Sequence, residues 1–182
     1  MLKVDIPSIK IEFYFKDILY KVNYDNEVLN IREELLPFIY EVTMSKDEVK
    51  FYKYNIVNGI KDIVLNKEKN DLIKRINYAI SNSNLVSSVI DLDKFNYNVK
   101  NILLSNGNIA LCNISIKSIN NYSYIDILLL ESKDIIGSIK INNDEILVNV
   151  DSIYLDETLK LVKGFVSLFK NKKEYKIKTL KL

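Results

Sequence analysis

Apolar and polar residues alternate near the start of the chain, and this pattern constrains the fold more than any other feature. Ile9, Ile11, Phe13 and Phe15 alternate with Lys10, Glu12, Tyr14 and Lys16. Alternation with period two is typical of a strand with one buried face. The same period continues from Ile18 to Tyr24, so we expect two strands in this region.

The periodicity changes after Asp25-Asn26, and residues 27–82 are predicted to be mainly helical. Val28, Ile31 and Leu35 have the spacing of one helix face, and Pro37 should end or kink that helix. A second helix is expected over 46–66, where Ser45 and Glu48 form a capping-box pattern. A third is expected near 70–82. The alternative for the middle segment is a hairpin, because Phe38–Met44 and Val49–Val57 are rich in aromatic and β-branched residues.

Strands are predicted again over residues 97–150. Val99–Leu104 and Ile109–Lys117 flank Asn106-Gly107, a dipeptide that favours a tight hairpin turn. Three further apolar runs follow between short polar breaks, at Tyr124–Glu131, Ile135–Ile141 and Glu145–Val150. Short connections suit antiparallel neighbours, so a meander of about five strands is expected.

A C-terminal amphipathic helix is predicted near 156–170, followed by a basic tail at 171–182 in which Tyr175–Leu182 could form a strand. The helix has an apolar stripe that is suited to covering a sheet. The whole order predicts a single α+β domain over residues 1–182, with helices packed on an antiparallel sheet. PAS-like and helix-grip folds resemble this coarse order in shape alone, since no motif of either family is present.

Composition excludes several kinds of chemistry. The 182 residues include 1 Cys and 0 His. Imidazole catalysis, His-ligated zinc and thiolate metal clusters are therefore excluded, and no intrachain disulfide can form. Cys112 lies among apolar residues and is expected to be an inert, buried thiol. No cofactor is predicted, and any metal would be a hard cation such as Mg²⁺.

Three aspartates form the only candidate catalytic set. Asp91 and Asp93 lie two apart after the apolar pair Val89-Ile90, and Asp126 lies between two isoleucines. On strands, such carboxylates could hold a divalent cation for phosphoryl transfer. This arrangement resembles the nucleotidyltransferases, which carry D-x-D on one strand and a single Asp on a later one. The chain lacks the Gly-Ser turn that those enzymes place upstream. Alternatively, all three aspartates are simply solvated.

The C-terminal tail offers a candidate nucleic-acid site. Its lysines could neutralise phosphates, and Tyr175 could stack on a base. The candidate residues are Lys172, Lys173, Tyr175, Lys176, Lys178 and Lys181. The formal charge of the whole chain is only +2, which is low for a dedicated nucleic-acid binder. A solvated terminus is the alternative.

The composition and the motifs together favour a non-catalytic protein that binds another protein or assembles with itself. Tyrosine is enriched at interfaces, and Tyr52, Tyr54, Tyr122 and Tyr124 could form part of one. A nucleic-acid-associated protein and a metal-dependent transferase remain alternatives. No apolar run is long enough to span a bilayer and no signal-peptide pattern is seen, so a cytoplasmic location is expected.

Overall fold

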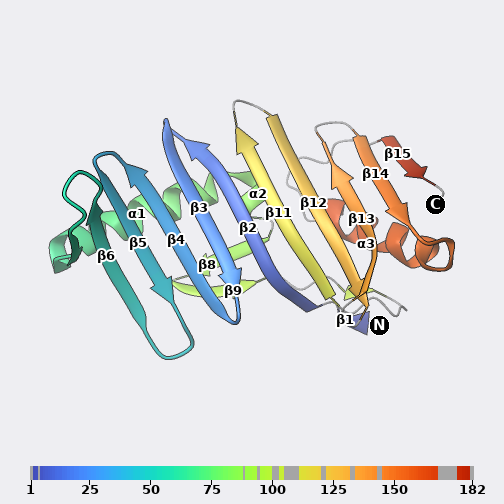
Figure 1. Ribbon diagram of the computed structural model, residues 1–182, viewed down its shortest axis with the longest axis horizontal. Helices are drawn as coiled ribbons and strands as arrows, with labels where there is room; N and C mark the ends of the chain where they lie inside the picture. The colour runs from blue at the N-terminus through green and yellow to red at the C-terminus, as the bar shows by residue number, and fades with distance from the viewer. Residues whose placement is uncertain are drawn as a thin grey trace.

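A single mixed sheet of eleven strands dominates the computed structural model (Figure 1). The structure describes residues 2–3, 5–87, 89–93, 95–99, 103–104, 111–119, 122–131, 134–142, 145–167 and 176–180. The strand order is β15-β14-β13-β12-β11-β2-β3-β4-β5-β6-β7. Two neighbouring pairs, β2 with β11 and β14 with β15, are parallel, and the other pairs are antiparallel.

The N-terminal half of the sheet is a meander in which each strand pairs with the next. Its strands are β2 (Asp5–Phe15), β3 (Ile18–Asp25), β4 (Val28–Leu35), β5 (Phe38–Met44), β6 (Val49–Asn55) and β7 (Lys61–Ile63). Two-residue turns connect the first strands, and Lys16, Asp17, Asn26 and Glu27 all have positive φ. Positive φ at both central residues is the geometry that joins twisted strands most tightly.

The second half of the sheet begins beside the first strand of the meander. Its strands are β11 (Leu111–Ile119), β12 (Tyr122–Glu131), β13 (Asp134–Ile141), β14 (Glu145–Val150) and β15 (Lys176–Leu180). Because β11 pairs with the edge of β2 opposite to β3, the two meanders extend in opposite directions from the middle of the sheet. Figure 1 shows this arrangement, with β6 at one end and β15 at the other.

The helices and the smaller strands lie behind the sheet in the view of Figure 1. They are α1 (Asn66–Ser81), α2 (Asn84–Ser87), the hairpin of β8 (Ile90–Asp93) and β9 (Asn96–Val99), the pair β1 (Leu2–Lys3) and β10 (Leu103–Leu104), the short 3-10 turn η1 (Ser152–Tyr154), and α3 (Leu155–Ser167). No helix in the described part of the chain is both long and apolar enough to cross a membrane.

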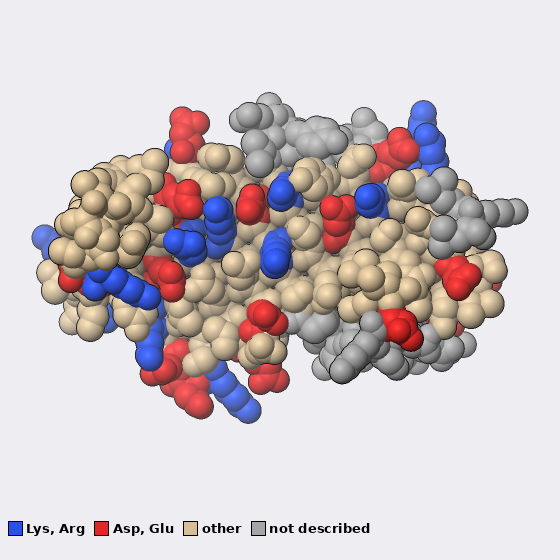
Figure 2. Space-filling view, viewed as in Figure 1, with Lys and Arg blue, Asp and Glu red and all other residues tan. Residues whose placement is uncertain are grey.

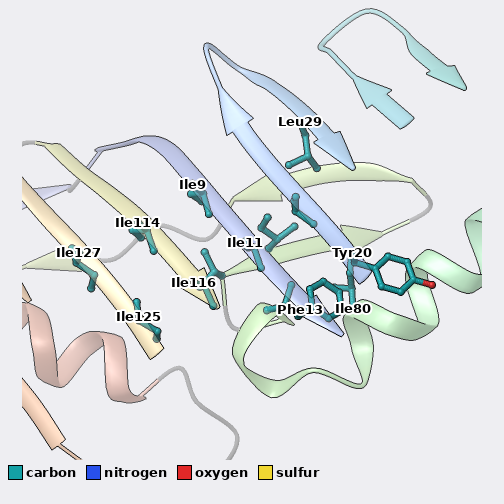
Figure 3. Close-up of a cluster of buried hydrophobic side chains, with 14 of the residues drawn as sticks. Ile9, Ile11, Phe13, Tyr20, Leu29, Ile80, Ile114, Ile116, Ile125 and Ile127 are labelled. Atoms are coloured by element: carbon teal, nitrogen blue, oxygen red, sulfur yellow. The ribbon is translucent and has the colours of Figure 1, made fainter. Parts of the chain in front are cut away.

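One hydrophobic core lies between the sheet and these elements (Figure 3). Ile9, Ile11 and Phe13 of β2 are buried there beside Ile114 and Ile116 of β11. Helix α1 contributes Leu72, Ile76, Ala79 and Ile80, and α3 contributes Leu161 and Val162. The alternating residues of the same strands face the opposite side, which no helix covers in the described structure.

A polar network fixes α1 to the sheet inside this core. Glu33 of β4 is fully buried, and its carboxylate accepts hydrogen bonds from Arg75 Nε at 3.1 and 3.2 Å and from Arg75 Nη2 at 2.9 Å. The Tyr20 hydroxyl donates a fourth bond at 2.7 Å. Burial raises the pKa of Tyr20, and the hydrogen bond to Glu33 adds to the effect. A buried carboxylate is tolerated because it is paired and hydrogen-bonded.

The predicted architecture is wrong in its main feature. A five-stranded antiparallel meander packed by helices was expected, whereas the structure has one mixed sheet of eleven strands. The region 27–82 is helical only from Asn66, because the segment before Pro37 that was expected as a helix forms β4, and the segment 46–66 forms β6 and β7. The hairpin alternative, with Phe38–Met44 and Val49–Val57 as strands, is confirmed by β5 and β6.

Other local predictions agree with the structure. The two N-terminal strands are β2 and β3, and the helices expected near 70–82 and 156–170 are α1 and α3. The last three strands predicted within 97–150 are β12, β13 and β14. The strand proposed for the tail is β15. The hairpin turn predicted at Asn106-Gly107 lies outside the described residues.

Candidate interaction surface

The uncovered side of the sheet carries a mosaic of charges (Figure 2). The strand register aligns Lys10 with Ser115, Asp126 and Lys140 in one row across four strands. A second row aligns Lys117, Glu12, Lys21, Arg32 and Glu41. Figure 2 shows basic and acidic side chains alternating along this face, so neither sign dominates it. A continuous track of positive charge, as a nucleic-acid backbone requires, does not form here.

Several of these charges are paired across neighbouring strands. Lys21 Nζ lies 3.5 Å from a Glu34 carboxylate oxygen, and Arg32 Nε lies 3.9 Å from one of Glu41. Such partly exposed pairs contribute at most about 1 kcal/mol each to stability. They leave the face polar and solvated.

A shallow hollow of about 430 Å³ lies on the same face. Lys10, Asp126 and Lys140 line it together with Asn113, whose Oδ1 is buried and has no hydrogen-bond partner. None of the three charged residues forms an ion pair within the described part of the chain. The hollow is open, and its walls combine these polar groups with apolar surface that includes Leu128.

The two candidate catalytic aspartates whose side chains are described, Asp91 and Asp126, are not brought together. Asp126 lies on the uncovered face of β12, because its neighbours Ile125 and Ile127 are buried in the core. Asp91 lies on β8, behind the sheet, and lines a separate hollow with Asn77 and Ile80 of α1. The side chain of Asp93 is outside the described structure. Among the described residues, no group of three His, Cys, Asp or Glu side chains could hold a metal ion.

The lysine tail is described only in part. Lys176 and Lys178 lie on β15 at one edge of the sheet, and Lys178 Nζ is 3.1 Å from a Glu145 carboxylate oxygen. Lys172, Lys173, Tyr175 and Lys181 lie outside the described residues. The two described lysines therefore sit on a sheet edge, and one of them already has an acidic partner.

The tyrosines do not form one patch. Tyr52 and Tyr54 lie on β6, with the Lys61 ammonium 4.2 Å from the centre of the Tyr52 ring. Tyr124 lies across the sheet on β12, and the side chain of Tyr122 is not described. Most of the sheet separates the two groups.

Exposed aliphatic residues gather instead at the β7 end of the sheet, a region we call the apolar corner. Its members are Leu36, Ile56, Val57, Ile60, Ile63 and Leu65. The Ile56 N–H donates to the Pro37 carbonyl at 3.0 Å, so the β4–β5 and β6–β7 turns lie side by side. Leu36 is 71% exposed and Val57 is 82% exposed. Figure 2 shows mostly uncharged side chains over the end of the molecule where β6 lies in Figure 1, with a few charged ones at its margin.

The backbone of β7 at this corner also has N–H and C=O groups that point away from the sheet, where no further strand of the described structure pairs with them. The Val64 N–H donates to Phe51 and the Asn55 N–H donates to Ile60, so Asp62, which pairs with Lys53, directs its backbone groups toward β6. By the alternation of an antiparallel ladder, Lys61 and Ile63 direct theirs away from the sheet. The exposed Ile63 side chain and outward backbone groups thus coincide on β7.

The opposite edge of the sheet differs. On β15, exposed lysines at 176 and 178 alternate with Ile177 and Thr179. Lysines on an edge strand oppose pairing with another chain. On β7, the ammonium group of Lys61 lies over the Tyr52 ring of β6. The described charges on β15 are thus both positive, whereas β7 carries one lysine and one aspartate, so opposite charges are available along its edge.

Comparison with other proteins gives no further guide. No protein-family model matches the chain, and no characterised protein or solved structure is significantly similar to it.

The sequence patterns do not predict that the residues of the apolar corner are exposed. The helix predicted over 46–66 places Ile56, Ile60 and Ile63 on its buried stripe, whereas the structure exposes all three. A signal for the true arrangement is present in Asn58-Gly59, since this dipeptide favours a tight turn and Gly59 has φ of +72°. Glu33 is missed because the sequence predicts a helix at β4; as a strand, Leu29, Ile31 and Glu33 share its buried face.

Proposed function

We propose that this chain is a non-catalytic interaction protein that binds another polypeptide through the apolar corner. The observation that carries the proposal is the concentration of six exposed aliphatic side chains at one end of the sheet. Single exposed hydrophobic residues are normal on a protein surface, but several gathered in one region favour an interaction site. Four of the six lie on or beside two adjacent turns, where they contribute little to the fold.

The chemistry of the chain supports the same function. The chain has no His, which removes imidazole as a general base, and no group of three metal-ligating side chains occurs among the described residues. The uncovered face carries both signs of charge. A protein partner can match an apolar surface beside such a mosaic more readily than a polyanion can.

The test compares what the wild type and two variants bind. Tagged protein is purified at low salt from its native source, and the accompanying proteins, including untagged copies of the chain, are quantified by mass spectrometry. The variants are Val57→Lys, in the corner, and Ile135→Lys, whose side chain is also exposed but lies at the start of β13. Circular dichroism confirms that both remain folded.

We expect the bound polypeptide to be lost from Val57→Lys and kept by Ile135→Lys. If both variants keep the same partners as the wild type, or if neither the wild type nor the variants bind any polypeptide, the proposal is wrong. Nucleic acid released by salt from all three proteins would instead favour binding outside the corner.

A further inference from the structure

We infer that the occupant of the apolar corner is a second copy of this chain, paired antiparallel along β7 about a two-fold axis at Ile63. The inference rests on the proposed function and specifies its partner. It joins two eleven-stranded sheets into one continuous sheet across the dimer.

The free edge is long enough for such pairing. Lys61 and Ile63 direct their backbone groups outward, and Leu65 continues the extended conformation with φ of −70° and ψ of 153°. The Leu65 carbonyl accepts a hydrogen bond from Lys69, so its N–H is the group left for an added strand. An edge with free donors and acceptors is a template for another strand.

Charge selects the register. With the axis at Ile63, the two Ile63 residues face one another and Lys61 faces Leu65 of the second copy. Asp62 then faces Val64, so no like charges are opposed. An axis at Asp62 would oppose two aspartates, and an axis at Lys61 would oppose two lysines. Like charges directly opposite one another destabilise a strand pair, which leaves Ile63 as the centre.

Charge also disfavours head-to-tail assembly. Joining β7 of one copy to β15 of the next would bring Lys61 beside Lys176 and Lys178. That contact would also repeat without closing and produce filaments. A two-fold β7 contact closes after two copies and buries Ile63, which is 74% exposed in the single chain.

The first measurement is the molar mass in solution by sedimentation velocity over a concentration series. We expect the wild type to pass from monomer to dimer as concentration rises, because a short edge contact is a small interface. Ile63→Lys should stay monomeric over the same range. Ile153→Lys is the matched control, since Ile153 is 77% exposed and lies in η1, away from the corner.

The register is tested by cross-linking in a Cys112→Ala background, which removes the natural thiol. Opposed residues of a hydrogen-bonded pair have Cα atoms about 5.5 Å apart, within the range of a disulfide. Ile63→Cys should therefore form a covalent dimer on mild oxidation. Asp62→Cys should not, since the two introduced thiols would be two residues out of register.

Each result decides one point. A wild type that stays monomeric at every concentration, or a dimer that Ile63→Lys does not disrupt, overturns the inference. A dimer in which the Asp62→Cys variant cross-links and the Ile63→Cys variant does not overturns the register. If dimerisation fails but Val57→Lys still loses a polypeptide that Ile135→Lys retains, the proposed function stands with a different partner.

Discussion

Replacing Arg75 with methionine should test whether the buried network holds α1 on the sheet. The Glu33 carboxylate is fully buried and accepts three hydrogen bonds from Arg75 and one from Tyr20. Methionine keeps much of the apolar stem of arginine but removes the charge and all three of those hydrogen bonds. The carboxylate would remain in the core with only the Tyr20 hydroxyl.

The expected loss can be derived from these contacts. Removing one partner of a buried ion pair costs about 3–5 kcal/mol, because the other charge stays buried without compensation. The Arg75 side chain is 35% exposed, so water reaches part of the pair and the lower end of that range applies. The guanidinium also lies 5.4 Å from the centre of the Tyr40 ring, which adds about 0.5 kcal/mol. We therefore expect Arg75→Met to lower the free energy of unfolding by about 3.5 kcal/mol.

The chain contains a matched control. Arg32 pairs with Glu41 across neighbouring strands on the uncovered face, at 3.9 Å and with both side chains partly exposed. Arg32→Met should cost less than about 1 kcal/mol. Urea unfolding followed by far-ultraviolet circular dichroism measures both values. Equal losses for the two variants would refute the reasoning. So would a double variant, Arg75→Met with Glu33→Leu, that is no more stable than Arg75→Met alone.

Three further outcomes follow from named contacts. Burial and Glu33 raise the pKa of Tyr20, so above about pH 10 the unfolded chain loses the hydroxyl proton while the folded chain keeps it. The free energy of unfolding of the wild type should then fall by an extra ~1.4 kcal/mol per pH unit relative to Tyr20→Phe. Urea titration at pH 9 to about 11 measures this difference. Parallel slopes for the two proteins would contradict this. Gly137→Ala should destabilise the fold by about 1–3 kcal/mol, since the added Cβ would lie 2.6 Å from the Asn149 carbonyl oxygen and 2.8 Å from Val150. Gly59→Ala, at φ of +72° in an open turn, should cost about 1 kcal/mol. Thermal melting compares the two variants, and the reverse order of stability would be inconsistent with the packing described. Leu72→Ala should cost about 2–5 kcal/mol through the cavity left under α1, and a loss below about 1 kcal/mol in urea unfolding would show that α1 does not pack as described.

Local patterns predict the elements in which burial and periodicity coincide. In β2, every second residue from Ile9 to Phe13 is buried, so the alternation is visible without interruption. In α1, Leu72, Ile76, Ala79 and Ile80 form one buried stripe with helical spacing. In each of these elements the apolar residues are numerous enough to reveal the buried face, even though Arg75 lies beside the stripe of α1.

The prediction fails where a charged residue stands on a buried face. The inward side of β4 is Leu29, Ile31 and Glu33, and the glutamate is stabilised by residues 13 and 42 positions away. No local pattern reveals those partners. Val28, Ile31 and Leu35 have helical spacing, but Val28 is exposed and Leu35 is only half-buried, so that spacing does not describe a real face.

The joining of the two meanders into one sheet is also beyond local reasoning. It depends on β2 pairing with β11, so Ile9 aligns with Ile114 across more than half of the chain. Both strands look like ordinary half-buried strands, and neither carries a mark of its neighbour. The candidate surface is missed for a related reason: an exposed isoleucine and a buried one are identical in sequence, and only the turn at Asn58-Gly59 distinguishes them.

The costs of association differ between the two surfaces that the fold leaves uncovered. Covering the open face of the sheet would remove water from partly exposed pairs such as Lys21–Glu34, and desolvation of ion pairs offsets much of the attraction gained. Covering the apolar corner removes water from aliphatic side chains, at a gain of about 25 cal/mol for each Å² buried. The outward backbone groups of Lys61 and Ile63 would exchange water for hydrogen bonds to an added strand. Association at the corner therefore gains apolar burial without the desolvation of a charge mosaic, and this difference favours the β7 end over the wider sheet face.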